Sequence, residues 1–195
     1  MAEKTGERRD QILQTVAQML EAPAGEKITT AALAARLSVS EAALYRHFKG
    51  KAEMYDGLIE FIEHTLFALV NRITSEEKSG LRQLEGIIGV LLGFAQKNRG
   101  MTRVLIGEAL VNEDERLQTR INQLHERLEA AVKQALRFGV SQQEIAQDVD
   151  IAAHANLIMS FVAGRWYQFA KSGFKRDPLE LWAKQWRLLM EGVIA

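Results

Sequence analysis

Residues 28–48, which read ITTAALAARLSVSEAALYRHF, predict two short helices joined by a tight turn. Thr29 or Thr30 can cap the first helix, and Ser40 can cap the second, which we expect to end near His47. Two short helices separated by three or four residues form a helix-turn-helix. Small alanines allow the helices to cross closely, and the apolar side chains form a shared core: Leu33, Leu37, Val39, Leu44 and Phe48.

The other side chains of this segment are expected to point outward and to suit the major groove of DNA. With Thr29, the candidate DNA-binding residues are Thr30, Ser40, Glu41, Ala42, Tyr45, Arg46, His47, Lys49 and Lys51. Recognition helices read base edges near their N-terminal half, where Ala42 can touch a thymine methyl group. Arg46 can pair with guanine or with a phosphate, and phosphates can also be held by Thr30, Tyr45, His47, Lys49 and Lys51. The alternative is a helical hairpin that binds no nucleic acid.

The local charge also favours a polyanionic partner. The 195-residue chain has 25 basic and 25 acidic side chains, but residues 27–51 hold five basic side chains and one acidic side chain, which gives this segment a charge of +4. A neutral protein with one basic segment can bind a polyanion through that segment. The alternative is an ordinary solvated helix face.

The composition predicts an all-α protein. Apolar residues make up 47% of the chain, cysteine is absent, and Pro23 and Pro178 are the only prolines. Abundant Ala, Leu, Glu, Gln and Arg favour helix. The apolar runs are far shorter than the ~20 residues of a membrane-spanning helix, and the N-terminus lacks the apolar segment of a signal peptide. We therefore expect a cytoplasmic protein that does not enter a membrane.

Hydrophobic periodicity and cap residues predict about nine helices. Outside the helix-turn-helix they lie near residues 10–21, 51–73, 81–96, 101–110, 112–138 and 148–171, and from 177 onward. Asn112 with Glu115, and Ser141 with Glu144, have the spacing of capping boxes. Gly139 is expected to end the 112–138 helix, and Asp177 before Pro178 is expected to cap the last helix.

The short helices come first and the long ones follow, which predicts two parts: a head over residues 1–50 and a larger helical body over residues 51–195. In the body, Gly86, Gly89 and Gly93 lie roughly on one side of their helix. Glycines at such positions indicate the close approach of a packed helix, a partner or an effector.

The sequence contains no pattern typical of an enzyme or a metal site. The four histidines are far apart, and no Gly-x-Ser-x-Gly, phosphate-loop or dinucleotide-binding pattern occurs. We therefore expect no metal, no cofactor and no enzymatic activity.

The head is similar to that of TetR-type DNA-binding proteins. The family pattern of a hydroxyl cap, an apolar-tyrosine pair, a histidine-phenylalanine pair and a lysine is matched at Ser40, Leu44-Tyr45, His47-Phe48 and Lys51. The resemblance implies a TetR-like fold, in which the body serves regulation and dimerisation, and a homodimer that binds palindromic double-stranded DNA. It assigns part of the apolar surface of the last two helices to a four-helix interface between subunits. The candidate dimer residues are Ile158, Val162, Trp166, Trp182, Trp186 and Leu189; the alternative is that they form core alone.

Further segments between about residues 8 and 130 resemble the nucleoid occlusion branch of this family. They are residues 57–63, 91–95, 101–105 and 120–124. This implies a nucleoid-associated inhibitor of division-ring assembly that acts on the tubulin-like GTPase FtsZ. The branch uses the surface of its fourth and fifth helices for this partner, which points to Phe61, Gly93, Lys97 and Asn98. The chain departs from the branch near this surface, because Leu69 replaces a basic residue and Arg99 replaces proline.

Two alternatives stay open at this point. One is a ligand-responsive repressor of the same fold, in which a small molecule in the body releases DNA. The other is a helical adaptor that binds only protein. The apolar stripes of the body hold few polar residues, which argues against a small-molecule effector.

Overall fold

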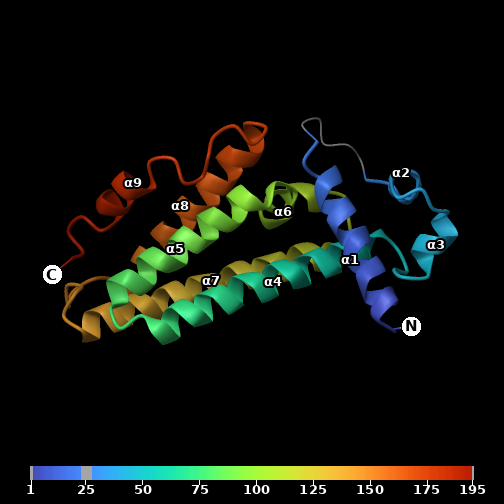
Figure 1. Ribbon diagram of the computed structural model, residues 1–195. Helices are drawn as coiled ribbons and strands as arrows, with labels where there is room; N and C mark the ends of the chain where they lie inside the picture. The colour runs from blue at the N-terminus through green and yellow to red at the C-terminus, as the bar shows by residue number, and fades with distance from the viewer. Residues whose placement is uncertain (1, 23–27, 195) are drawn as a thin grey trace. The chain divides into compact units, whose positions relative to one another are not determined.

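The computed structural model describes residues 2–22 and 28–194. These residues form nine α-helices and one 3₁₀ helix, η1, and no strand beyond an isolated bridge between Ile145 and Ile194. The elements, labelled in Figure 1, are α1 (Ala2–Met19), α2 (Thr30–Arg36), α3 (Glu41–Tyr45), α4 (Lys51–Glu76), α5 (Gly80–Lys97), α6 (Arg99–Leu105), η1 (Glu108–Leu110), α7 (Glu115–Ser141), α8 (Ile151–Lys171) and α9 (Trp182–Leu189). The expected all-α class is confirmed. None of the described helices combines the length and the apolar character needed to cross a membrane.

The chain packs into two compact units. Unit 1 runs to Ile62 and includes Asn98–Ile121, so it holds α1 to α3, the first half of α4, α6, η1 and the start of α7. Unit 2 holds Glu63–Lys97 and the residues from Asn122 onward. The expected division into a head over residues 1–50 and a body over residues 51–195 stays a prediction.

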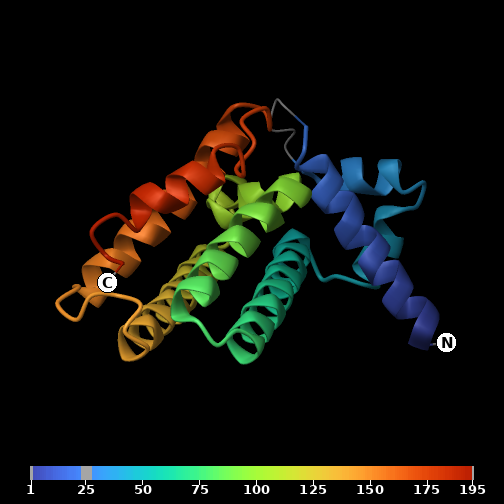
Figure 2. The same ribbon diagram turned by 60° about the vertical axis from the view of Figure 1, so that its left-hand side comes forward.

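In unit 1, α1 packs against both α2 and α6, and Figure 2 shows α1 running past the helix-turn-helix. Ile12 and Val16 of α1 are at most 1% exposed, as their spacing on one helix stripe predicts. The crossing of α1 with α6 depends on Gly100. A Cβ atom at Gly100 would lie 1.9 Å from the carbonyl oxygen of Ala17, so only glycine fits there.

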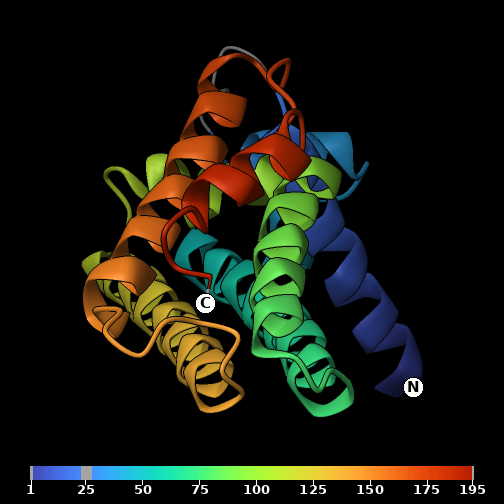
Figure 3. The same cartoon turned by 90° about the vertical axis from the view of Figure 1, so that its left-hand side faces the viewer.

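In unit 2, α5 and α8 pack against each other, and α9 lies alongside them (Figure 3). Trp166 is fully buried, and its indole N–H donates a hydrogen bond to the carbonyl oxygen of Leu91 at 3.0 Å. The glycines of α5 face the chain's own side chains, since a Cβ atom at Gly89 would meet Trp182 at 3.8 Å and one at Gly93 would meet Leu179 at 3.9 Å. These are ordinary van der Waals distances, so packing within unit 2 does not by itself require glycine at either position.

Two expected features around the end of α7 are wrong. The helix continues through Gly139 to Ser141. Gly139 serves packing instead, because a Cβ atom at this position would lie 2.7 Å from the Ile145 side chain. The expected Ser141–Glu144 capping box is absent. The Ser141 hydroxyl donates to the carbonyl of Phe138, and the Glu144 carboxylate accepts the N–H of Leu81 at 3.0 Å.

Two helix starts also differ from expectation. Before α7, Asn112 has a left-handed backbone (φ 65°), and the Asp114 carboxylate accepts the N–H of Arg116 at 3.1 Å. Asp177 does cap, but it caps a turn by accepting the N–H of Leu179, and α9 begins only at Trp182. The left-handed conformation just before Trp182 separates this turn from the helix.

Candidate nucleic-acid interface

Two side-chain caps build the helix-turn-helix. The Thr29 hydroxyl accepts the backbone N–H of Ala32 at 3.1 Å, and the Ser40 hydroxyl accepts that of Ala43 at 3.2 Å. Each bond satisfies one of the donors that the start of a helix leaves unpaired. Of the two threonines that could cap α2, the structure selects Thr29. Both short helices begin where the sequence predicts.

One face of α3 is exposed and the opposite face is buried. Leu44 is 1% exposed and packs inside the head, whereas Tyr45 is 50% exposed. The expected groove-facing set on and around α3 lies on the exposed side: Ser40, Glu41, Ala42, Tyr45, Arg46 and Lys49. The face therefore presents a hydroxyl, a methyl group, a phenol and two cations, which suits contact with bases and phosphates.

Thr30 and Glu41 are bound to each other. The Thr30 hydroxyl donates to the Glu41 carboxylate at 2.6 Å, which joins the start of α2 to the start of α3. This bond fixes the two helices at the end where a recognition helix meets base edges. In this structure Thr30 and Glu41 therefore hold α2 and α3 in position.

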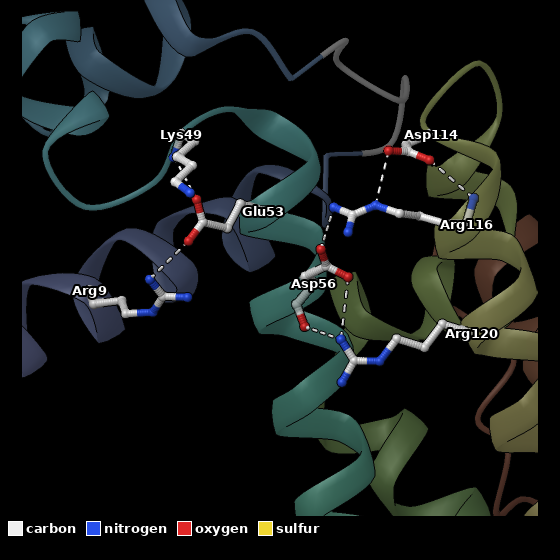
Figure 4. Close-up of polar contacts among 7 residues, drawn as sticks. All are labelled: Arg9, Lys49, Glu53, Asp56, Asp114, Arg116 and Arg120. Carbon is white, nitrogen blue, oxygen red and sulfur yellow. Dashed lines mark hydrogen bonds and ion pairs between the residues drawn. The ribbon is translucent and has the colours of Figure 1, made fainter.

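Arg9 is a residue of the head that the sequence analysis did not single out. Its guanidinium lies 4.2 Å from the centre of the Phe48 ring and donates to the carbonyl oxygen of His47 at 3.0 Å. It also lies 3.5 Å from the Glu53 carboxylate (Figure 4). These contacts join α1 to the turn between α3 and α4. A signal was present, because Arg9 falls on the same helix stripe as the buried Ile12 and Val16.

Glu53 completes this junction. Its carboxylate accepts the backbone N–H of Lys49 at 2.6 Å. That hydrogen bond, together with the nearby charge of Arg9, lowers the pKa of Glu53 below its ordinary value of 4.5, although partial desolvation opposes the change. The bond leaves the ammonium group of Lys49 outside, and the side chain is exposed.

Lys51 is placed differently from the other expected phosphate ligands. Its ammonium forms an ion pair with the Glu113 carboxylate, and the two side chains are only 22% and 17% exposed. The ammonium also lies 5.6 Å from the centre of the Tyr55 ring. His47 is half-buried as well. Arg46 and Lys49 are therefore the more accessible cations of the expected set.

A second charge cluster joins α4 to α7 inside unit 1. Figure 4 shows Asp56 between two arginines of α7. One Asp56 oxygen lies 2.6 Å from Arg116 and the other lies 3.3 Å from Arg120. Asp114 binds Arg116 from the other side at 2.9 Å. Sequence spacing could not indicate this cluster, since Asp56 and its partners are 60 and 64 residues apart.

The four residues expected to meet a protein partner are divided between the two units. Phe61 and Asn98 belong to unit 1, and Phe61 is 48% exposed. Gly93 and Lys97 belong to unit 2, where Lys97 is exposed and Gly93 faces Leu179. Asn98 precedes α6, and its carbonyl oxygen accepts the N–H of Thr102 at 3.0 Å.

The residues expected at a dimer interface also fall into two groups. Ile158, Val162 and Trp166 are completely buried inside unit 2, so these three side chains have no surface left to bury against a second copy. They are part of the subunit core. Trp182, Trp186 and Leu189 are half-buried, and Trp182 stacks on Phe161 with ring centres 6.2 Å apart.

The exposed face of α8 carries a different set of residues. Leu157 is 53% exposed and Tyr167 is 55% exposed. They share a helix stripe with three further exposed residues: Ala153, Ser160 and Gly164. The stripe is uncharged, and a Cβ atom at Gly164 would meet nothing within 4 Å.

Two family models match the chain. Residues 13–58 match the bacterial regulatory proteins of the tetR family, and residues 78–193 match a tetracyclin repressor-like C-terminal domain. The first match covers the helix-turn-helix together with the C-terminal part of α1 and the start of α4. The second covers α5 to α9.

Relatives and solved structures agree with these matches. The chain is 47% identical to the nucleoid occlusion factor SlmA of Idiomarina loihiensis over all of both proteins, and 49% identical to that of Alteromonas mediterranea over 95% of each. A TetR-family regulator from Agrobacterium tumefaciens has the same fold, with a TM-score of 0.80 at 16% identity over 98% of this chain and all of that one. The expected TetR-like fold is confirmed. The chain belongs to the tetR family of bacterial regulatory proteins and, within it, to the nucleoid occlusion factor SlmA family.

Proposed function

We propose that this protein is a nucleoid occlusion factor. As a homodimer bound to specific palindromic sites on the chromosome, it inhibits assembly of the FtsZ ring over the nucleoid. One observation carries the proposal: relatives named nucleoid occlusion factor SlmA match the chain at 47–49% identity over 95–100% of its length. The cytoplasmic nucleoid is then its place of action.

The head supports the DNA-binding part of this proposal. Arg46 and Lys49 are exposed beside the outward face of α3, while the hydrogen bond between Thr30 and Glu41 fixes how α2 and α3 meet. In a dimer, two such heads reach half-sites about one DNA turn apart, roughly 34–36 Å, or a multiple of it. A palindromic site follows from that symmetry.

The exposed stripe of α8 supports dimerisation. It runs from Ala153 to Tyr167 without a charged residue, and Gly164 lets a second helix approach closely. An uncharged exposed stripe of this kind marks an interaction surface. We place the subunit interface on this stripe, with the half-buried side chains of α9 beside it.

For the contact with FtsZ we propose four residues, which are Phe61 and Asn98 of unit 1 and Gly93 and Lys97 of unit 2. Phe61 offers an exposed aromatic ring. Lys97 ends α5, where the helix dipole favours a cation that stays available to an acidic partner. Of the two departures from the branch, Arg99 is exposed and Leu69 is half-buried.

The test is co-sedimentation of purified FtsZ polymers with the protein, with and without a duplex selected from random DNA. We expect the DNA-bound protein to reduce the pelleted FtsZ. The double variant Lys97→Glu/Asn98→Ala should lose this inhibition and keep its DNA affinity. Lys175→Glu is the matched charge reversal, because Lys175 is exposed and is not one of the proposed contact residues; it should behave like the unaltered protein.

Two outcomes would overturn parts of the proposal. Inhibition that survives in Lys97→Glu/Asn98→Ala contradicts the surface assignment. A protein that binds its DNA site tightly but never affects FtsZ, with or without DNA, contradicts nucleoid occlusion and favours the ligand-responsive repressor.

A further inference from the structure

The contact of Lys51 with Glu113 sets this lysine apart from the other cations of the head. Lys51 is the first residue of α4, and Glu113 lies in the turn before α7. Both side chains are mostly shielded from water, at 22% and 17% exposure. Arg46 and Lys49, by contrast, are exposed. Of these three cations, Lys51 is therefore the one whose ammonium forms an ion pair that is mostly shielded from water.

The surroundings strengthen this ion pair. The Tyr55 ring, one turn further along α4, lies 5.6 Å from the ammonium. Burial, and to a lesser degree the charge of Glu113, raise the pKa of the Tyr55 hydroxyl well above its ordinary value, which shows that the carboxylate acts on a poorly hydrated region. Charges attract more strongly where water is partly excluded.

The pair can nevertheless open. It lines a cavity of about 420 Å³ within unit 1, together with Tyr55 and Val111. Lysine carries its charge on a flexible four-carbon stem, so the ammonium can leave Glu113 without movement of the helix. A DNA phosphate is the kind of anion that could replace the carboxylate.

We propose that Glu113 competes with the DNA backbone for Lys51, so that DNA binding requires Lys51 to exchange a carboxylate for a phosphate. The inference rests on the proposed DNA binding and deepens it. Glu113 then lowers the affinity for every DNA sequence alike, because a phosphate contact carries no sequence information. The identity of one residue outside the helix-turn-helix thus sets how tightly the head holds DNA.

The experiment measures DNA affinity against salt concentration for the full-length protein, with a selected duplex and a scrambled duplex of equal length. Glu113→Gln keeps the shape of the side chain and removes its charge. We expect it to raise the affinity for both duplexes by about fivefold, the scale of one ion pair. Lys51→Ala should lower the affinity and reduce the salt slope by about 0.9, because one phosphate contact and its released counterion are lost.

The double variant distinguishes competition from a general charge effect. If Glu113 acts through Lys51, Lys51→Ala/Glu113→Gln binds like Lys51→Ala alone. The matched control is Glu115→Gln, because Glu115 is an exposed carboxylate two residues further on. It should change the affinity by less than about twofold. Thermal unfolding of each variant confirms that the head stays folded.

Three results would overturn the inference. An unchanged salt slope in Lys51→Ala means that Lys51 never reaches a phosphate. A gain from Glu113→Gln that persists in the Lys51→Ala background, or that Glu115→Gln matches, means that Glu113 acts by its charge alone. No gain at all means that the pair does not compete. If the unaltered protein binds neither duplex, the proposed DNA binding itself fails, and the inference fails with it.

Discussion

At the scale of single residues, some basic side chains of the head face solvent and others bind groups within the head. Arg46 and Lys49 face solvent beside α3, whereas Arg9 is engaged with Phe48, His47 and Glu53. A basic residue in a DNA-binding head is therefore not a DNA ligand by default. The contacts of Arg9 make it a connection between α1 and the end of α3.

We expect Arg9→Ala to lower the free energy of unfolding by about 1–2 kcal/mol, because it removes a cation–π contact and a hydrogen bond to a part-buried carbonyl. Arg9→Lys should recover only part of this, since an ammonium cannot reproduce the planar stacking. The matched control is Arg8→Ala, because the Arg8 guanidinium donates a hydrogen bond to Gln11 of its own helix. It should stay within about 0.5 kcal/mol of the unaltered protein. Chemical denaturation measures all three. Equal effects of the two alanine variants would mean that the Arg9 contacts contribute nothing.

Which side chains of the head lie outward was easier to predict from the sequence than which residues they pair with. The caps Thr29 and Ser40 follow from local rules, because the atoms they bond lie three residues away. The partners of Lys51 and Asp56 lie about 60 residues away, and no spacing rule connects them. The exposure of the residues around α3 was therefore predictable, whereas the ion pair of Lys51 with Glu113 was not.

At the scale of elements, helix existence was predictable and helix ends were not. All expected helices are present, because each carries a clear apolar stripe. The errors arise because a glycine or a cap residue can end or start a helix, but can also serve packing or cap a turn. Gly139 resembles a helix stop, but it lies inside α7 where Gly80 approaches closely. Only the packed structure tells these two uses of glycine apart.

The crossing of α1 with α6 gives a prediction of the same kind. Gly100→Ala places a methyl group 1.9 Å from the carbonyl oxygen of Ala17 and 3.0 Å from Leu20, so the two helices must move apart. We expect a loss of about 3 kcal/mol or more in unfolding free energy, at the upper end of overpacking costs. Gly6→Ala on α1 is the control, because its new Cβ atom meets nothing within 4 Å. It should be neutral, or stabilising by up to about 1 kcal/mol. If the Gly100→Ala variant and the unaltered protein have the same melting temperature, α1 and α6 do not pack as described.

At the scale of the whole molecule, α8 has one buried stripe and one exposed stripe, and we propose the exposed one for dimerisation. The stripe that the sequence makes conspicuous, with Ile158, Val162 and Trp166, is buried inside the subunit. The stripe left for a second copy contains Leu157, Gly164 and Tyr167. Large apolar residues attract attention in a sequence, but close contact between helices also uses small ones. The proposed interface therefore uses the opposite face of α8 from the one that carries Ile158, Val162 and Trp166.

This placement predicts how the dimer can be broken without unfolding the subunit. Leu157→Glu puts a charge in the middle of the uncharged stripe, where the side chain is 53% exposed in the single chain and burial comes only from a partner. We expect the dimer dissociation constant to rise at least about 30-fold, which corresponds to a central contact worth about 2 kcal/mol. Sedimentation velocity across a dilution series measures it. Val111→Glu is the matched control, because Val111 is 66% exposed and belongs to unit 1, whereas α8 belongs to unit 2; this variant should remain a dimer.

The same variant connects assembly to DNA binding. Two linked heads bind a palindrome far more tightly than one head binds a half-site, because the second contact is intramolecular. Leu157→Glu should therefore lose affinity for the full palindrome while its affinity for a single half-site stays unchanged. A variant that is monomeric at the concentration of the binding measurement and still holds the palindrome as tightly as the unaltered protein would contradict symmetric recognition. A Leu157→Glu variant that stays dimeric would instead move the interface off this stripe, toward the half-buried side chains of α9.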